Sequence, residues 1–166
     1  MKSFTFDYPI FIEDLNLSKS YIKNVKNKKL KQYDFNENNF FDKEDINFSL
    51  ETNKEIQQFL LKVTSTLSYT EYKLEKTWIQ KYKENDFHDC HIHGVNTFSF
   101  ILYIDCTDKS SKTQFYNMGY PYISNKTFTV SPKIGRCIIF DGAIPHAVLP
   151  NKDNKRLVVS GNIVFE

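Results

Sequence analysis

Cysteine and long apolar runs are scarce in this sequence. The 166 residues include three cysteines, Cys90, Cys106 and Cys137, which form no CxxC pair and make an odd number. A disulfide scaffold is therefore not expected, and reduced thiols in a cytoplasmic protein are the simpler interpretation. No run approaches the roughly 18 apolar residues of a membrane span. Asp7 and Pro9 also interrupt the apolar core that a signal peptide would need. We therefore expect a cytoplasmic protein with no membrane segment.

An excess of one charge sign is also absent. The chain has 22 Lys and Arg against 20 Asp and Glu, a formal net charge of +2. This balance is too close to neutral to predict a surface for nucleic acid or membrane. Arginine itself is rare, with only Arg136 and Arg156, and three of the four histidines lie between positions 88 and 93. Rare residue types that cluster or stand alone are where we look for chemistry.

The length favours one domain over residues 1–166. A chain of this size can bury roughly 70% of the surface that it exposes when unfolded, so it needs no disulfide or structural metal to fold. We divide the domain into an N-terminal part, residues 1–72, with a strand, helices and a lid, and a core of strands at 73–166.

The N-terminal part is predicted to contain one strand and two helices. Alternating apolar residues at 4–12 predict a strand, and Pro9 favours an edge position for it. Loose helical spacing at 18–31 predicts a short exposed helix, whose many lysines are expected to form a solvated face rather than a basic binding patch. Residues 32–51 are polar with scattered Phe, and are expected to form a loop or lid.

A second helix is predicted more firmly. Thr52 or Asn53 is a suitable N-cap, and Glu55 lies in the first turn. The apolar residues that follow have spacings of three and four, which predicts one buried face packed on a sheet. They are Ile56, Phe59, Leu60, Val63 and Leu67.

From Lys73 onward the pattern is that of short strands. The intervening segments are rich in Asn, Asp, Gly, Pro and Ser, which favour turns. Two helices followed by six or more strands, without strand–helix alternation, predict a mainly β protein: a sandwich or barrel with flanking helices. The predicted strands lie at 78–82, 97–104, 114–116, 126–130, 136–140 and 156–165.

Two of the clustered histidines, His91 and His93, form a His-x-His motif. Residues two apart on a strand point to the same face, so the two imidazoles can converge on one point. Such a pair is half of a site for a borderline transition metal such as iron, zinc, copper or nickel. The alternative is a chance pair on a polar turn. His88 could add a fourth ligand, although a place in the loop leading to the site is the more usual role for it.

A third histidine strengthens the metal interpretation. His146 follows a buried strand, a Gly turn and Pro145, and is the one histidine outside the cluster. A metal triad commonly takes two ligands close in sequence and a third from a distant strand, because a closed sheet brings such strands together. His91, His93 and His146 have that arrangement.

Arg156 lies ten residues after His146, on the last predicted strand. Alternation places Arg156, Val158, Ser160 and Asn162 on one face of this strand. An arginine inside a barrel would be a costly unpaired charge unless it grips a carboxylate. The alternative is an ion pair with a surface acid. Arg136 follows a glycine in a turn, and we interpret it as structural.

The stretch from Trp78 to Glu166 resembles the small Fe(II)- and 2-oxoglutarate-dependent oxygenases with a His-x-His motif, a family with a double-stranded β-helix (jelly-roll, cupin-like barrel) fold. The resemblance covers more than half of the chain, and the order and spacing of its parts are its most specific feature. The parts are Trp78-x-x-x-Tyr82, His91-x-His93, 97–104, 113–116, 135–141, Pro145-His146, and Arg156 followed by Ser160 and Asn162, with an opening strand at 4–12.

The resemblance implies roles for these residues. His91 and His146 would be iron-binding histidines, and Arg156 would anchor the distal carboxylate of 2-oxoglutarate, with Ser160 or Tyr82 as further contacts. The 2-oxo acid group would chelate the iron and leave a position for O2, and the coupled reaction would oxidise a second substrate, most simply by hydroxylation. The family therefore implies Fe(II), 2-oxoglutarate and O2 as cofactor and cosubstrates.

The sequence departs from the family pattern at one position. His93 stands where the usual His-x-Asp or His-x-Glu motif has its acid. Three neutral imidazoles would leave the full +2 charge on the metal, which the 2-oxoglutarate dianion would neutralise, and the preferred metal stays open. Asp105 or Asp141 could supply a carboxylate instead, but both follow predicted strands, where an exposed turn aspartate is the more usual case.

Two other functions fit the same architecture. A cupin also presents His-x-His and a later histidine, but it usually adds a glutamate shortly after the motif, which the sequence lacks at 94–99, and it needs no arginine after its last histidine. A non-catalytic jelly-roll binding protein would leave the three histidines unexplained. The expected prime substrate is a peptide side chain or a small metabolite, and nucleic acid is not expected. Residues 32–51 and 109–125 are expected to select it.

Overall fold

The computed structural model describes residues 8–28, 42–45, 53–94 and 96–166. Its strands form two sheets in which all neighbours pair antiparallel. The larger sheet has the order β1(Ile10–Asp14), β8(Arg136–Asp141), β5(Phe98–Asp105), β10(Arg156–Phe165), β3(Tyr72–Tyr82), β2(Asp42–Asp45). The smaller sheet has the order β4(His88–His91), β9(His146–Val148), β6(Thr113–Tyr116), β7(Thr127–Val130).

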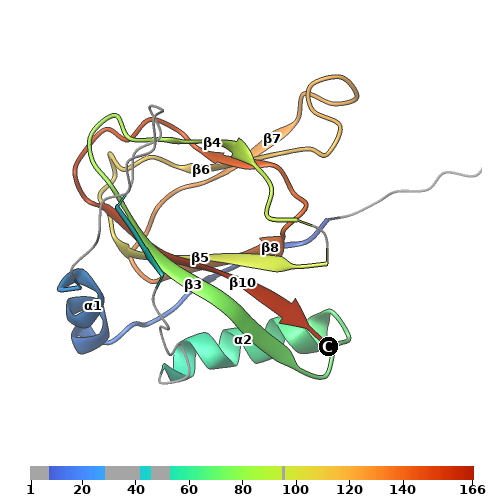
Figure 1. Cartoon of the computed structure of the whole chain (residues 1–166), viewed down its shortest axis with the longest axis horizontal. Helices are drawn as coiled ribbons and strands as arrows, with labels where there is room; N and C mark the ends of the chain where they lie inside the picture. Colours follow the sequence, from blue (N-terminus) through green and yellow to red (C-terminus); the bar gives the residue numbers. More distant parts are fainter. Residues whose placement is uncertain (1–7, 29–41, 46–52, 95) are drawn as a thin grey trace, which may run out of the picture.

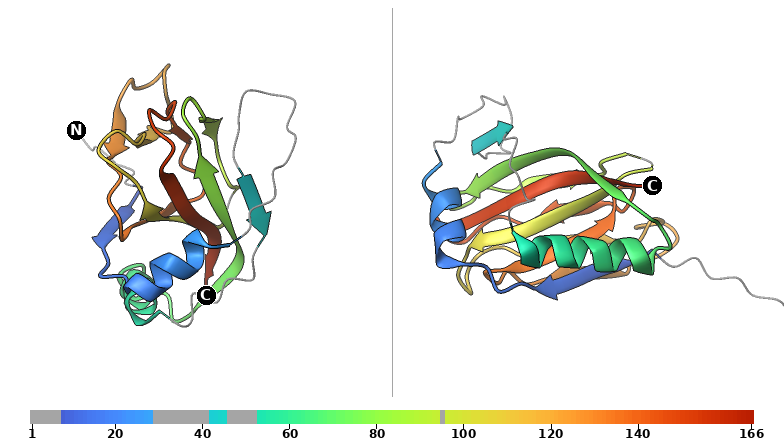
Figure 2. Two further views of the ribbon diagram at one scale, coloured as in Figure 1. Left: turned by 90° about the vertical axis from the view of Figure 1, so that its left-hand side faces the viewer. Right: turned by 90° about the horizontal axis from the view of Figure 1, so that it is seen from below.

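The two sheets face each other, and the helices α1(Lys19–Lys26) and α2(Lys54–Thr66) lie on the outer face of the larger sheet (Figure 1). Figure 2 shows the same layers from two further directions. This arrangement is the predicted mainly β jelly roll with flanking helices.

Each face of the larger sheet has its own apolar cluster, because side chains alternate between the faces of a strand. Leu102, Ile139 and Val159 belong to the cluster beneath the helices. Tyr103, Phe140 and Val158, each one residue away, belong to the cluster between the sheets. The candidate site lies in this second layer, where residues of both sheets meet.

The second helix was predicted correctly. Asn53 is the N-cap, with its Oδ1 accepting from the backbone N–H of Glu55 at 3.0 Å. The first four residues of the predicted stripe are buried, and Leu67 packs against the same cluster. One heptad of apolar spacing therefore determined which face of α2 meets the sheet.

Three predictions for the N-terminal part need correction. The first strand begins at Ile10, after Pro9, and is an edge strand as predicted; positions 4–7 of the predicted strand lie outside the described residues. The first helix ends at Lys26 and is not simply exposed, because Tyr21 and Val25 are buried on the sheet. The segment predicted as a loop or lid contains β2, which pairs with β3; its positions 32–41 and 46–51 lie outside the described residues.

Candidate functional site

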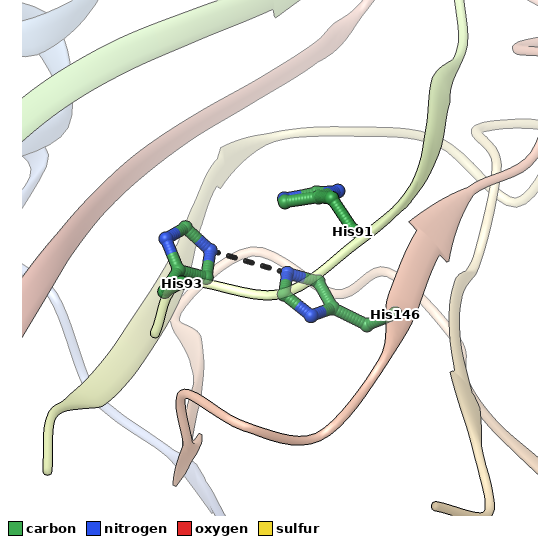
Figure 3. Close-up of side chains that lie close together, drawn as sticks. All are labelled: His91, His93 and His146. Carbon is green, nitrogen blue, oxygen red and sulfur yellow. Dashed lines mark hydrogen bonds between the residues drawn. The ribbon is translucent and has the colours of Figure 1, made fainter. Parts of the chain in front are cut away.

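The three predicted metal ligands meet at the edge of the smaller sheet. His91 ends β4 and His146 begins β9, and the two residues are direct partners in the antiparallel ladder. His93 reaches the same point from the segment after β4 (Figure 3). One ligand atom from each imidazole can be chosen so that all three lie within 4.8 Å of one another.

The reason for this convergence differs from the one predicted. His91 and His93 do not share a strand, because β4 ends at His91. The backbone N–H of His93 instead donates to the carbonyl of Gly142 at 2.8 Å, which ties it to the turn before His146. A Cβ at Gly142 would lie 2.7 Å from the Thr97 carbonyl oxygen, so only glycine permits this close approach.

Backbone carbonyls orient two of the imidazoles. Nδ1 of His146 lies 3.0 Å from the carbonyl oxygen of Ile144, and Nδ1 of His91 lies 2.8 Å from that of Asp89. With Nδ1 donating in each case, Nε2 keeps its lone pair for a ligand. Nε2 of His146 lies 3.3 Å from Nε2 of His93. Two nitrogens that share a metal at ~2.1 Å are at most about 4.2 Å apart, so this pair fits one ion.

Desolvation favours the neutral forms of His91 and His146, and the neutral imidazole is the form that binds metals. His146 is 3% exposed, and this burial, assisted by the neighbouring His91, lowers its pKa to about 3. Burial also lowers the pKa of His91. Desolvation disfavours the charged imidazolium, so His91 and His146 present lone pairs rather than positive charges at neutral pH.

The other predicted ligands lie outside this cluster. Asp105 pairs with Lys26 at 2.6 Å, and the carboxylate of Asp141 accepts from the backbone N–H of Ala143 at 2.8 Å. Among the described residues, no carboxylate belongs to a group that could hold a metal. His88 stacks on His91 with 4.0 Å between ring centroids but is not part of the triad.

Arg156 is completely buried between the two sheets. Its Nε donates to the carbonyl of Ser111 and its Nη2 to Oγ1 of Thr113, both at 3.2 Å. The guanidinium carbon lies 4.3 Å from the ring centroid of Tyr82 and 5.3 Å from that of Tyr103. These π faces and neutral acceptors attract a cation but do not neutralise it.

One nitrogen of the Arg156 guanidinium is left without a hydrogen-bond acceptor. In the part of the chain that the structure describes, no acid pairs with Arg156, and its buried Nη1 has no hydrogen-bond partner. The alternative of a surface ion pair is therefore wrong for Arg156. Arg136, interpreted as structural, does form such an ion pair: its Nε donates to Oδ1 of Asp14 at 2.7 Å.

One cavity connects the guanidinium to the histidines. It is small, with a volume of about 30 Å³, and Ser160 and Tyr82 line it. Oγ of Ser160 donates to Oε1 of Gln80 at 3.3 Å, whereas the buried hydroxyl of Tyr82 has no partner. Burial raises the pKa of Tyr82, so this hydroxyl stays protonated and available as a donor.

Sequence reasoning did not find the groups that hold Arg156. Thr113 and Tyr103 hydrogen-bond each other at 2.7 Å and lie beside the guanidinium. Trp78 was noted only as part of a family pattern, and its ring lies 6.0 Å from that of His93. Strand alternation could have placed these side chains on an inner face, but not against a particular residue of another strand.

The donor set fits iron and a dicarboxylate. Three neutral nitrogens suit a borderline divalent metal. A buried arginine with an unpartnered Nη1 and a nearby phenol suits a carboxylate. Both halves line the same cavity.

Comparison with known proteins agrees with this geometry. The sequence profile of a family described as "Putative 2OG-Fe(II) oxygenase" matches residues 76–162. No curated protein matches the chain. The described residues contain no helix with the length and apolarity to cross a membrane.

Several solved structures share the fold. A viral collagen prolyl hydroxylase of Paramecium Bursaria Chlorella virus-1, in its 2OG complex, is 16% identical with a TM-score of 0.67, over 93% of this chain and 94% of that chain. A Pseudomonas putida prolyl-4-hydroxylase is 12% identical with a TM-score of 0.69, over 96% and 94%. A 2OG-Fe(II) oxygenase family oxidoreductase from Burkholderia pseudomallei is 17% identical with a TM-score of 0.57; the match covers 69% of this chain but only 53% of that protein.

Proposed function

The chain belongs to the 2OG-Fe(II) oxygenase family, and we propose that it is a hydroxylase in which His91, His93 and His146 hold the iron. Members of the family use Fe(II), 2-oxoglutarate and O2. When bound, iron and 2-oxoglutarate supply the oxidation: one atom of O2 enters succinate as CO2 is released, and the other enters the substrate. Side chains of this protein bind and orient the cosubstrate and the substrate, and they exclude water from the site.

Arg156 is proposed to bind the distal carboxylate of 2-oxoglutarate. The observation that carries this assignment is its unpartnered Nη1, buried in the same cavity as the histidines. A carboxylate there would satisfy the donor and neutralise the buried charge. Tyr82 and Ser160 line the same cavity, and their hydroxyls are proposed as further contacts.

Replacement of the usual acid by His93 changes the charge of the site. Three neutral imidazoles leave the metal with its full +2 charge, and Arg156 adds another positive charge in the lining of the same cavity. A dianion such as 2-oxoglutarate complements both charges. We infer that the site favours a dianionic cosubstrate for this reason, while softer divalent metals compete well with iron for three nitrogens.

The prime substrate is proposed to be a peptide side chain or a small metabolite. Two structural neighbours are named as prolyl hydroxylases, and another, HygX from Streptomyces hygroscopicus, holds nickel, 2-oxoglutarate and hygromycin B. We expect no action on nucleic acid, since the net charge is only +2. The unpaired cysteines favour a cytoplasmic location. Mass spectrometry of a lysate incubated with the enzyme would reveal a substrate by the gain of one oxygen.

The cosubstrate assignment is tested with Fe(II) and 2-oxoglutarate in the absence of O2. A chelated 2-oxo acid gives a visible charge-transfer band. We expect Arg156→Met to raise the 2-oxoglutarate concentration needed for the band at least tenfold while the metal affinity stays the same. The reason is that loss of a charged bidentate partner costs more than about 1.4 kcal/mol of binding free energy. Arg136→Met is the matched control, since that arginine pairs with Asp14 on the surface.

The same experiment separates the proposed function from its nearest rival. Metal binding without a band at any 2-oxoglutarate concentration would favour a cupin-like metal site that uses no 2-oxo acid. Normal iron binding by both His91→Ala and His146→Ala would contradict the proposed ligand set.

A further inference from the structure

We propose that Asn151 is a positioning residue for Arg156, a role that depends on the proposed binding of 2-oxoglutarate by that arginine. Asn151 lies in the turn between β9 and β10 and is 1% exposed. A polar side chain buried this deeply must satisfy its hydrogen bonds within the protein. The groups that Asn151 contacts are those that surround the guanidinium.

Both ends of the Asn151 amide are in use. Its Oδ1 accepts from the backbone N–H of Ser111 at 2.8 Å. Its Nδ2 donates to the carbonyl of Tyr82 at 3.4 Å and to that of Asp153 at 2.5 Å. One side chain thus ties together the segment after β5, the end of β3 and the turn that leads into β10.

Two of these partners touch Arg156. The carbonyl of Ser111 accepts from Nε of Arg156 at 3.2 Å, and the ring of Tyr82 lies under the guanidinium at 4.3 Å. Asn151 therefore holds the backbone on both sides of the guanidinium. If these backbone positions shift, Nε loses its acceptor and the planar group can rotate away from its cavity-facing orientation.

Such control matters because arginine has a flexible side chain. Ordering a long side chain on binding costs affinity, and a group already fixed in its binding orientation avoids that cost. Arg156 has no acid to fix it among the described residues, so its orientation depends on neutral acceptors and ring faces. The restraint on those neighbours is what Asn151 supplies.

An amide suits this position better than the other side chains of its size. Aspartate could still accept from Ser111, but it has no donor for the two carbonyls. It would also bring a second carboxylate against Asp153, whose Oδ1 lies 3.1 Å from Nδ2 of Asn151. Asn151→Asp therefore removes half of the restraint with almost no change in volume.

The test is calorimetric binding of 2-oxoglutarate to the protein loaded with Mn(II), without O2. We expect Asn151→Asp to raise the Kd of 2-oxoglutarate about tenfold while the Kd of Mn(II) is unchanged, an effect of the size seen when supporting partners of a ligand-binding group are removed. The matched control is Asn154→Ala in the same turn, whose Oδ1 accepts only from the exposed backbone N–H of Glu84 at 3.0 Å. This control should bind 2-oxoglutarate like the wild type.

Three results would overturn the role of Asn151: an unchanged Kd for 2-oxoglutarate, a parallel loss of Mn(II) affinity, or an equal effect of Asn154→Ala. If Asn151→Asp does not fold, Asp153→Asn replaces it, and we expect a smaller rise in the same Kd; no rise would again contradict the proposal. Arg156→Met is measured alongside. If it binds 2-oxoglutarate like the wild type, the proposed function of Arg156 fails; if it binds weakly and Asn151→Asp binds normally, only the role of Asn151 fails.

Discussion

At the scale of single residues, the environment of each imidazole matters as much as its identity. His91 and His146 each direct Nδ1 to a backbone carbonyl, and desolvation of the half-buried His91 and the buried His146 favours their neutral forms. His88 has the same side chain and stacks on His91, yet it lies outside the triad. Backbone position thus separates the three proposed ligands from their neighbour His88.

Single substitutions at these histidines test that separation. We expect His91→Ala to lose at least nine-tenths of its bound metal after desalting, because only two of the three nitrogens remain. His88→Ala should retain the metal content of the wild type, since His88 lies outside the group of three histidines. Metal analysis of the purified variants measures both, and equal losses would show that His88 is a ligand as well.

At the scale of secondary structure elements, the smaller sheet carries His91 and His146, two of the proposed metal ligands, and the larger sheet carries Arg156. β9 is only three residues long, but its pairing with β4 places His146 opposite His91. The side chains of β10 alternate between the two faces of the larger sheet. Arg156 and Val158 face the cavity, whereas Leu157 and Val159 belong to the cluster beneath the helices. Helix α2 therefore supports the strand that carries Arg156 without approaching the site.

Helix α2 should contribute to stability through its buried face. Phe59 is 5% exposed in the cluster beneath the sheet, and we expect Phe59→Ala to lower the free energy of unfolding by about 3–5 kcal/mol. Leu61→Ala is the matched control: Leu61 is 56% exposed, so the change should stay within ~0.5 kcal/mol. Urea denaturation measures both. Similar values for the two variants would mean that α2 does not pack as described.

The pairing of β1 with β8 should depend on pH. Hydrogen bonds from Arg136 and Lys133 lower the pKa of Asp14 to about 2. In the unfolded chain this carboxyl titrates near its usual value, so its contribution to stability is complete above about pH 5 and is lost as the pH falls toward 2. Asp14 is 36% exposed, which limits that contribution to below about 1 kcal/mol.

Asp14→Asn should therefore be less stable than the wild type at pH 7, and the difference should shrink as the pH falls through about 2, as measured by urea denaturation across this range. Asp108→Asn, in an exposed turn, controls for the loss of one carboxylate. A difference between Asp14→Asn and wild type that stays constant with pH would exclude the ion pairs as its cause.

At the scale of the whole molecule, the fold needs no covalent cross-link. All three cysteines are free, as expected from their number and spacing: Cys90 is exposed, Cys106 is half-buried and Cys137 is buried. Burial raises the pKa of all three thiols, that of Cys106 to about 11, with the largest effect at Cys137. Apolar layers on both faces of the larger sheet provide the stability that a smaller domain would take from disulfides.

Thiol reactivity should follow this order of burial. With a disulfide-exchange reagent at pH 8, we expect Cys90 to react first, Cys106 more slowly, and Cys137 only when the protein unfolds, because the reactive species is an accessible thiolate. Absorbance of the released thiol gives the three phases. Cys90→Ser should remove the first phase alone, and rapid reaction of all three thiols in the native protein would contradict the described burial.

Much of this architecture was predictable because it depends on local pattern. The apolar spacing of α2 determines its buried face, and alternation along β10 places Arg156 and Ser160 on one face. Contacts between segments distant in the sequence were less predictable. The short strand β2 was missed because four polar residues, Asp42–Asp45, carry no apolar alternation, and the burial of α1 was missed because its lysines dominate its composition.

The candidate residues for chemistry could be named from the sequence, because histidine and arginine are rare in it and cluster or stand alone. Their contacts with one another depend on the folded chain. It places His93 beside His146 through the Gly142 carbonyl, and it surrounds Arg156 with Ser111 and Thr113, which are 45 and 43 residues away in the chain. Periodicity reports the face of a strand, but contacts across this distance depend on the pairing of strands, which no local pattern encodes.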